Sequence, residues 1–265
     1  MKELYSRMKG SLNLKRQYVQ FSILSLLYFV LYTLFSVVLG AIVHDAATII
    51  GFWILNLIST YVYMRFFFRM AAGMAKAEKT IYFRECIGML VLETILYFFT
   101  IALYYLFVAF VDLYVLIGII AYLYAFFAPA FQLFCFYQVF QGTKSPWRIV
   151  GGALKSMAKV WKAVIGACAA LAVVYCMLYI FSMGLEVMIS SLLPHVLILN
   201  IGVTMNRWME VGTLLLSMVT NQLYDSAVMM FLLMQVIAAV LFSCLYVLWM
   251  GWIAALCESA WNSRH

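Results

Sequence analysis

Residues 229–257 read MMFLLMQVIAAVLFSCLYVLWMGWIAALC, a stretch without a single charged side chain. An α-helix needs about 20 apolar residues to cross the hydrocarbon core of a bilayer, and this stretch exceeds that length. The rest of the chain shares its character, because 68% of the 265 residues are hydrophobic and only 10% are charged. Soluble domains contain roughly 45–50% apolar and about 25% charged residues. The sequence therefore predicts an all-α, integral membrane protein in which residues 1–265 form a single domain.

Five further segments are long and apolar enough to cross a bilayer. The sequence thus predicts a bundle of six transmembrane helices at residues 18–43, 47–69, 87–111, 113–140, 163–189 and 229–257. The first segment is longer than the apolar core of a secretory signal, which has about 7–15 residues, and no clear cleavage site follows it. We therefore interpret it as a membrane span.

The basic residues set the expected orientation of these spans. Apart from Arg207, every Lys and Arg precedes the first span, lies at the end of span two or between spans two and three, lies between spans four and five, or follows the last span. Cytoplasmic loops carry an excess of Lys and Arg, so both termini are predicted to be cytoplasmic. The net charge of +7 is thus concentrated at one membrane surface, which argues against nucleic acid as a partner and favours anionic lipid headgroups.

The only long external segment is 190–228. It contains two apolar runs, 196–205 and 211–220, each too short to cross the membrane and separated by polar and charged residues. Three interpretations remain open: an ordered external cap, a re-entrant hairpin, or a seventh span that would move the C-terminus outside.

Residues 145–162 read SPWRIVGGALKSMAKVWK and predict a cytoplasmic amphipathic helix. Ser145 is a favourable N-cap residue, and Pro146 suits the first helical position. At about 100° per residue, four basic side chains fall on one stripe: Arg148, Lys155, Lys159 and Lys162. The opposite, apolar face comprises Val150, Ala153, Leu154, Met157, Val160 and Trp161.

A second basic stripe is expected where the helix of span two continues beyond the membrane. It comprises Arg65, Arg69, Lys76 and Lys79. Either stripe can anchor the protein to anionic lipid headgroups, each basic residue contributing about 1 kcal/mol near the surface. Alternatively, one or both stripes dock a cytoplasmic partner such as the ATPase of a transporter.

Glu93 is the one carboxylate well inside a predicted span. Gln132 is expected at a similar depth, and Asn56 lies near the middle of span two. An ionised acid in hydrocarbon is costly, so Glu93 must be paired, face water or carry a proton. These three residues are candidates for an intramembrane polar site, either as a structural contact or as a functional proton or ion site.

No pattern of catalytic residues is present in the sequence. The three histidines are isolated from one another, there is no phosphate-binding glycine-rich motif, and the six cysteines lack metal-ligand spacing. We therefore expect neither an enzyme nor a bound cofactor, and any ATP that powers the protein would bind to another chain.

The segment Pro129-Ala-Phe, followed by GGALKSMAKVWK at 151–162, resembles uncharacterised bacterial six-helix membrane families. It is also similar to the membrane domain that accompanies some glycerophosphodiester phosphodiesterases. The resemblance covers residues 120–175 and implies a multi-pass protein of the bacterial cytoplasmic membrane. These families offer no catalytic residues to transfer, and the chain has no counterpart of the phosphodiesterase catalytic domain.

The overall plan resembles the permeases of type-2 ABC exporters. Residues 1–17, 70–86 and 190–228 would be the basic N-terminal segment, the cytoplasmic coupling helix and the external re-entrant helices. This resemblance implies a transport subunit that works with a separate ATPase and dimerises. The chain departs from the pattern because its largest amphipathic helix lies between spans four and five. The alternative function is a non-catalytic membrane scaffold, or a regulatory or assembly factor.

Overall fold

The computed structural model describes residues 19–21, 23, 27, 45–75, 81–109, 114–183, 211, 214–215, 218 and 226–262. Within this part the predicted all-α class is confirmed, since its elements are helices and none of its residues forms a strand. The helices are α3 (Asp45–Ala75), α4 (Phe83–Ala109), α5 (Tyr114–Phe140), α6 (Pro146–Lys159), α7 (Trp161–Met183) and α10 (Ser226–Asn262). Both termini, Lys76, Lys79, nearly all of 18–43 and most of 190–228 lie outside the described residues.

Apolar helices long enough to enter a membrane are present among the described residues. By length and composition, two helical stretches can cross a bilayer, Ile49–Gly73 and Val228–Asn262. A third is gained if Pro146–Lys159 and Trp161–Val174 are counted as one span bent by 94°. At 1.5 Å per residue α10 is about 55 Å long, so it exceeds the hydrocarbon thickness of about 30 Å.

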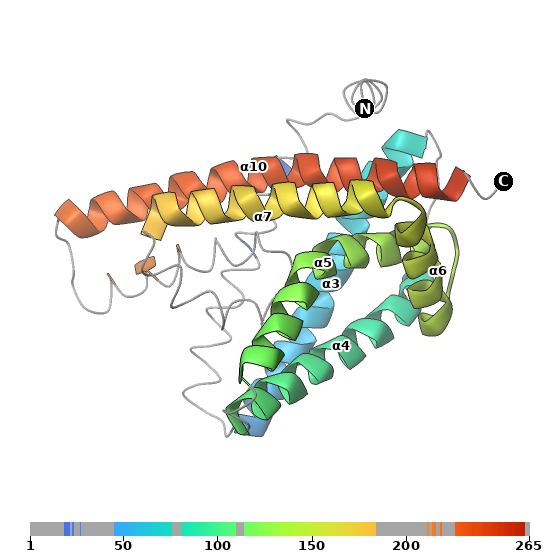
Figure 1. The fold of residues 1–265 in the computed structure, drawn as a ribbon, viewed down its shortest axis with the longest axis horizontal. Helices are drawn as coiled ribbons and strands as arrows, with labels where there is room; N and C mark the ends of the chain where they lie inside the picture. The colour runs from blue at the N-terminus through green and yellow to red at the C-terminus, as the bar shows by residue number, and fades with distance from the viewer. Residues whose placement is uncertain are drawn as a thin grey trace.

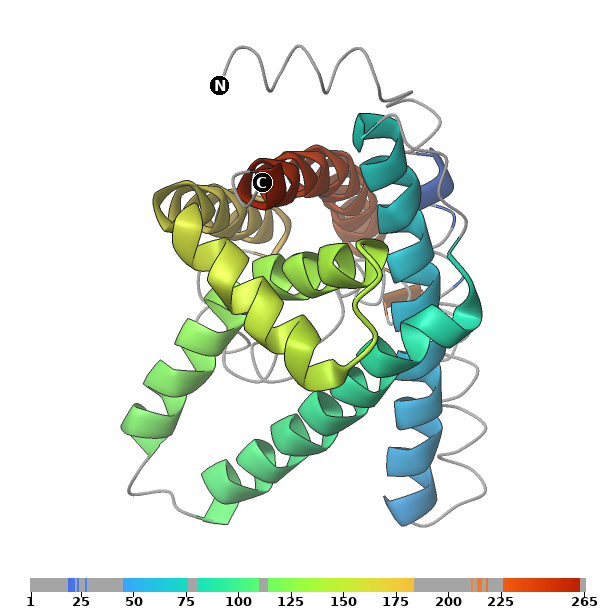
Figure 2. The ribbon, with the colours of Figure 1, turned by 90° about the vertical axis from the view of Figure 1, so that its right-hand side faces the viewer.

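The described helices form two groups (Figure 1). α7 and α10 lie side by side along one side of the molecule, while α3, α4 and α5 form the other group. α10 also contacts α3 and α5, which joins the two groups. Pro129 lies inside α5, where it removes a backbone donor, and Figure 2 shows this helix changing direction along its length.

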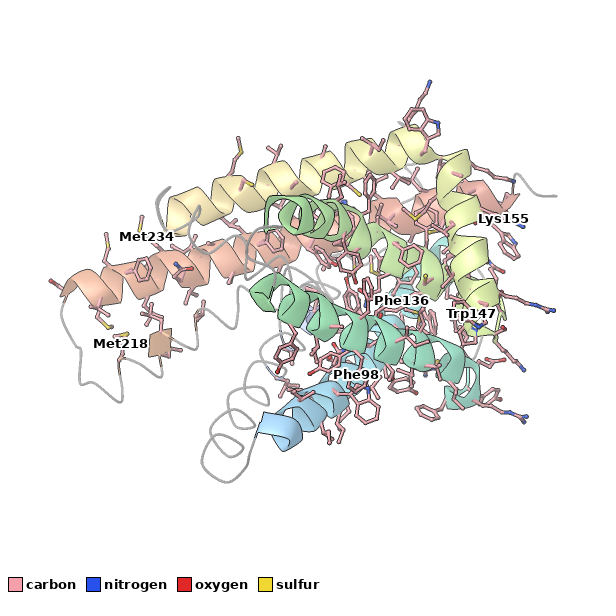
Figure 3. All side chains as sticks on the ribbon, turned by 60° about the horizontal axis from the view of Figure 1, so that its bottom comes forward. Phe98, Phe136, Trp147, Lys155, Met218 and Met234 are labelled. Carbon is pink, nitrogen blue, oxygen red and sulfur yellow. The ribbon has the colours of Figure 1, made fainter. Side chains whose placement is uncertain are left out.

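All Lys and Arg residues of the described part belong to one end of the molecule, which we call the basic end. There α3 and α5 finish, α4 and α7 begin, and α6 crosses the bundle. Figure 3 shows Trp147 and Lys155 of α6 at this end. The basic end comprises Arg65, Arg69, Arg84, Lys144, Arg148, Lys155, Lys159 and Lys162.

A tight turn carries the chain from α5 into α6. Gly142 has a φ of 94°, a left-handed conformation that favours glycine. Its N–H donates to the Val139 carbonyl at 2.8 Å, and the N–H of Thr143 donates to the Gln138 carbonyl at 3.0 Å. This pair of bonds closes the C-terminus of α5 as a Schellman motif. The predicted start of the next helix is confirmed, because α6 begins at Pro146 with Ser145 as its N-cap residue.

An aromatic cluster holds α3, α5 and α10 together near the basic end. The hydroxyls of Tyr63 and Tyr246 lie 2.5 Å apart in a buried hydrogen bond. The ring of Tyr63 packs edge-on against Phe136, with centroids 5.7 Å apart. Trp249 donates from Nε1 to the Ala167 carbonyl at 2.8 Å, which connects α10 to α7. These contacts connect α3, α5, α7 and α10 through buried side chains.

Candidate functional site

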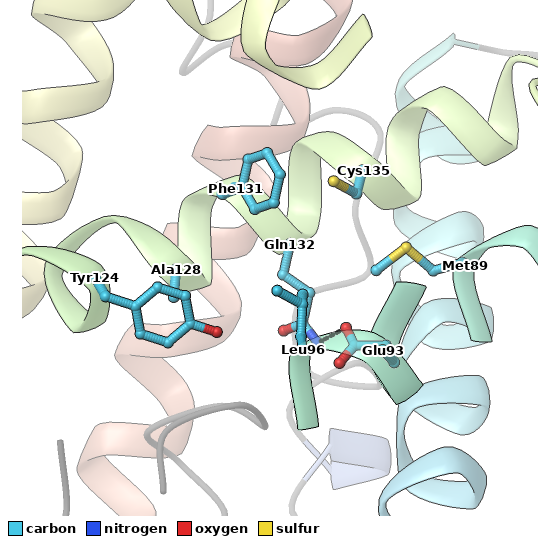
Figure 4. A pocket seen from close by; sticks show the side chains of 8 residues that line it. All are labelled: Met89, Glu93, Leu96, Tyr124, Ala128, Phe131, Gln132 and Cys135. Carbon is cyan, nitrogen blue, oxygen red and sulfur yellow. Dashed lines mark hydrogen bonds between the residues drawn. The ribbon is translucent and has the colours of Figure 1, made fainter. Parts of the chain in front are cut away.

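Glu93 and Gln132 meet inside the bundle, as the sequence suggested. Glu93 lies on α4 and is completely buried, and Gln132 lies on α5 with 7% of its surface exposed. Gln132 donates from Nε2 to Glu93 Oε1 at 2.7 Å, at the short end of the usual range for an N–H···O hydrogen bond (Figure 4). Two of the three predicted intramembrane residues are therefore in direct contact.

A small cavity lies beside this pair (Figure 4). Its volume of about 10 Å³ is close to the minimum that holds one water molecule. The wall is formed by one face of α4 and one face of α5, and comprises Met89, Glu93, Leu96, Tyr124, Ala128, Phe131, Gln132 and Cys135. The cavity is thus mainly apolar, with a few polar groups.

The second carboxyl oxygen of Glu93 makes no hydrogen bond to the described residues. Oε2 is buried, and no hydrogen-bond donor from the described residues reaches it. A buried polar atom without a partner is uncommon in native proteins and calls for a specific reason. Such a carboxyl group can carry a proton or bind one water molecule. A metal centre finds no support here, since no group of three His, Cys, Asp or Glu side chains gathers anywhere in the described ranges.

Asn56 does not join this site. It is buried on α3, but it is not among the residues that line the cavity. Its carbonyl accepts a hydrogen bond from the hydroxyl of Ser59 at 2.9 Å, and its Nδ2 has no partner within the described part of the chain. The predicted polar cluster is therefore smaller than the sequence suggested.

Tyr124 and Cys135 also line the cavity, and neither was singled out from the sequence. A signal was available, because Tyr124, Ala128, Gln132 and Cys135 follow one another at intervals of four, four and three residues. This spacing places them on one face of a helix. Helical spacing within residues 114–140 therefore places Tyr124 and Cys135 on the same face as Gln132.

The inner face of α6 packs tightly on α5. Gln138 donates from Nε2 to the hydroxyl of Ser156 at 3.2 Å, and that hydroxyl donates to the Gly152 carbonyl at 2.8 Å. A Cβ atom added at Gly152 would lie 2.5 Å from Gln138 Oε1, so glycine permits this close approach. The most deeply buried residues of α6 are Ile149, Ala153 and Ser156.

The outer face of α6 carries apolar as well as basic side chains. Arg148, Lys155 and Lys159 are exposed, in agreement with the predicted basic stripe. Trp147, labelled in Figure 3, is 76% exposed, and Leu154, the neighbour of Lys155 in the sequence, is 55% exposed.

Two residues of the predicted apolar face of α6 are also exposed. Leu154 lies at the surface, and Trp161, just beyond α6, is 55% exposed. The buried strip instead follows Ile149, Ala153 and Ser156, which are spaced four and three residues apart on one face of the helix. Lys162, the last member of the predicted stripe, is exposed at the start of α7, with its Nζ 5.6 Å from the centre of the Trp161 ring.

The residues of the second predicted basic stripe, at the end of α3, differ in their exposure. Arg69 is exposed, but Arg65 is half-buried and donates a hydrogen bond to the Ile81 carbonyl. Lys76 and Lys79 lie outside the described residues.

Comparison with known proteins adds no relative: the chain matches no protein-family profile, no curated protein and no solved structure.

Proposed function

We propose that the chain is a six-span protein of the bacterial cytoplasmic membrane with both termini in the cytoplasm. Soluble proteins rarely expose contiguous apolar patches larger than a few hundred Å². Here exposed apolar side chains follow the first half of α10: Met229, Met230, Leu233, Ile237, Val240, Leu241 and Leu245. The gathering of the described Lys and Arg residues at one end supports a cytoplasmic basic end.

Within that membrane protein, we infer a permease-like transport subunit that is powered by a separate cytoplasmic ATPase. The observation that carries this proposal is the two-sided character of α6. Its inner face contacts α4, α5, α7 and α10, whereas its outer face presents Trp147, Leu154 and three basic side chains. A helix that only anchors the protein to lipid does not need such extensive packing. A helix that transmits the movement of a partner to the bundle does need it.

Purification from native membranes in mild detergent, with mass spectrometry of the associated proteins, tests this proposal. We expect an ATPase in stoichiometric amount, and we expect its loss when Lys155→Glu and Lys159→Glu are combined. Arg84→Glu is the matched control, because Arg84 is an exposed basic residue of the same end but lies on α4. A cytoplasmic ATPase can reach α6 only if the basic end is cytoplasmic, so the experiment also tests the orientation. Purification of the wild-type protein without an ATPase would reject the transport function.

The second candidate function is a non-catalytic membrane scaffold. It is favoured by the exposed Trp147 beside the basic stripe, since tryptophan and basic residues together are typical of helices that lie in the headgroup region. The scaffold predicts a stable partner other than an ATPase. It also predicts that cells carrying Glu93→Gln behave as wild type.

A further inference from the structure

A second, larger pocket lies at the basic end, beside the last turns of α3. It has a volume of about 370 Å³, within the range of roughly 300–1,000 Å³ that is usual for small-molecule sites. One wall comes from α3 and the other from the first helical residues of the described chain. The lining residues are Gln20, Ile23, Tyr61, Val62, Arg65, Phe66 and Arg69.

The pocket is positively charged. Arg65 and Arg69 are four residues apart on α3, so they lie on the same side of the helix one turn apart. Among the described residues that line the pocket, none is acidic. The Ile81 carbonyl accepts one hydrogen bond from the Arg65 guanidinium. A guanidinium has five donors, so further donors remain for a ligand. Planar, paired donors of this kind match the oxygens of a phosphate group.

The wall next to the arginines is closely packed. Phe66 is 3% exposed, and its ring packs against the ring of Phe21 with centroids 5.4 Å apart. This contact holds the first helical residues against α3. The two arginines are therefore presented from a fixed surface and not from a free loop.

Apolar side chains continue from the pocket toward the membrane interior. On α3, Ile58 and Ile54 are 52% and 43% exposed, and they precede the pocket residues along the helix. On the facing segment, Ile23 and Leu27 are 51% and 53% exposed. The pocket therefore joins a cationic mouth at the basic end to two exposed aliphatic rows.

We propose that this pocket binds one anionic phospholipid. Its phosphate lies between Arg65 and Arg69, and its acyl chains follow the aliphatic rows of α3 and of the first helical residues. The charge of the mouth selects an anionic headgroup, and the aliphatic rows select a lipid over a soluble anion. The site is independent of the proposed ATPase, because none of its lining residues belongs to α6.

Native mass spectrometry of the full chain in detergent, titrated with phosphatidylglycerol or with phosphatidylcholine, tests this site. We expect one phosphatidylglycerol to remain bound and phosphatidylcholine to bind more weakly. The combination of Arg65→Gln and Arg69→Gln should weaken the binding of phosphatidylglycerol by about tenfold or more, since each charge-assisted bond contributes on the order of a tenfold change. Val62→Trp should weaken it as well, because the larger side chain fills the pocket without changing its charge.

Arg84→Gln is the matched control, since it removes one exposed arginine of the basic end outside the pocket. We expect this variant to bind phosphatidylglycerol as the wild type does. Three results would overturn the proposal: equal loss in Arg84→Gln, equal binding of phosphatidylcholine, or displacement of the lipid by inorganic phosphate at similar concentration. The first would indicate diffuse attraction to the basic end, and the last a site for a soluble anion. An unchanged unfolding temperature of Val62→Trp separates a filled pocket from a misfolded protein.

Discussion

Gln132 and Gln138 lie on the same helix, and each donates a hydrogen bond from Nε2 to a buried partner, but their surroundings differ. The partner of Gln138 is the hydroxyl of Ser156, which itself donates a hydrogen bond to the Gly152 carbonyl. Because Gly152 has no side chain, α5 and α6 can approach closely around this pair. The partner of Gln132 is Glu93, and the second carboxyl oxygen of Glu93, Oε2, accepts no hydrogen bond from the described residues.

The difference separates a packing contact from a candidate site. Around Gln138 the space is filled, so close packing and hydrogen bonding explain why these residues are there. Around Gln132 a cavity remains, next to a carboxyl oxygen with unused bonding capacity. Stability alone does not explain a buried acid of this kind, because a neutral side chain would cost less in the membrane. Three substitutions sharpen this contrast.

The largest effect is expected at another closely packed contact, where Gly88 of α4 lies against the turn before α6. A Cβ atom at Gly88 would lie 1.9 Å from the Lys144 carbonyl oxygen, and a backbone atom cannot move away as a flexible side chain can. We expect Gly88→Ala to lower the free energy of unfolding by about 3 kcal/mol. Chemical unfolding in detergent measures this change.

Gly151→Ala is the control for that substitution. No atom lies within 4 Å of a Cβ added at Gly151, and alanine favours a helix over glycine by about 0.5–1 kcal/mol. This variant should therefore be slightly more stable than the wild type. Equal stability of Gly88→Ala and Gly151→Ala would show that the turn does not rest on α4.

A smaller effect is expected for Gly152→Ala. Here the new methyl group meets the amide of Gln138, which can rotate away but then loses its bond to Ser156. We expect a loss of about 1–2 kcal/mol in the free energy of unfolding. In the background of Gln138→Ala the same substitution should cost much less, because the colliding group is gone. Additive effects of the two substitutions would contradict the packing described for this face of α6.

The smallest effect on stability is expected at the cavity. Glu93→Gln keeps an acceptor for Gln132 and loses no bond at Oε2, so the free energy of unfolding should change by less than about 1 kcal/mol. Gln132→Leu is the comparison. It removes the donor to Oε1, so both carboxyl oxygens of Glu93 lack a hydrogen bond, and the free energy of unfolding should fall by about 1–3 kcal/mol. A large loss in Glu93→Gln would make this pair structural, as the pair at Gln138 is.

Local sequence signals were accurate where they depend on the backbone. Ser145 and Pro146 predicted the start of α6, and the continuation of the span-two helix past Arg69 is confirmed by α3, which ends at Ala75. These predictions hold because proline geometry and helical periodicity act within a few residues of the chain. Ser145 occupies the N-cap position, but its side chain makes no capping hydrogen bond. Contacts between helices could not be predicted from the sequence to the same extent. Depth along a span suggested that Glu93, Gln132 and Asn56 belong together, but depth says nothing about the direction in which each side chain points.

The sequence by itself determined that this protein is helical and apolar enough to enter a membrane, and it determined which residues are charged and where along each helix they fall. Those properties follow from composition and from periodicity along the chain. Only the tertiary structure decided that Gln132 and not Asn56 reaches Glu93, that Leu154 stays exposed on α6, and that Arg65 and Arg69 share a pocket with the first helical residues. The physical reason is that helix rotation and crossing are set by side-chain packing between distant segments, which no local pattern specifies.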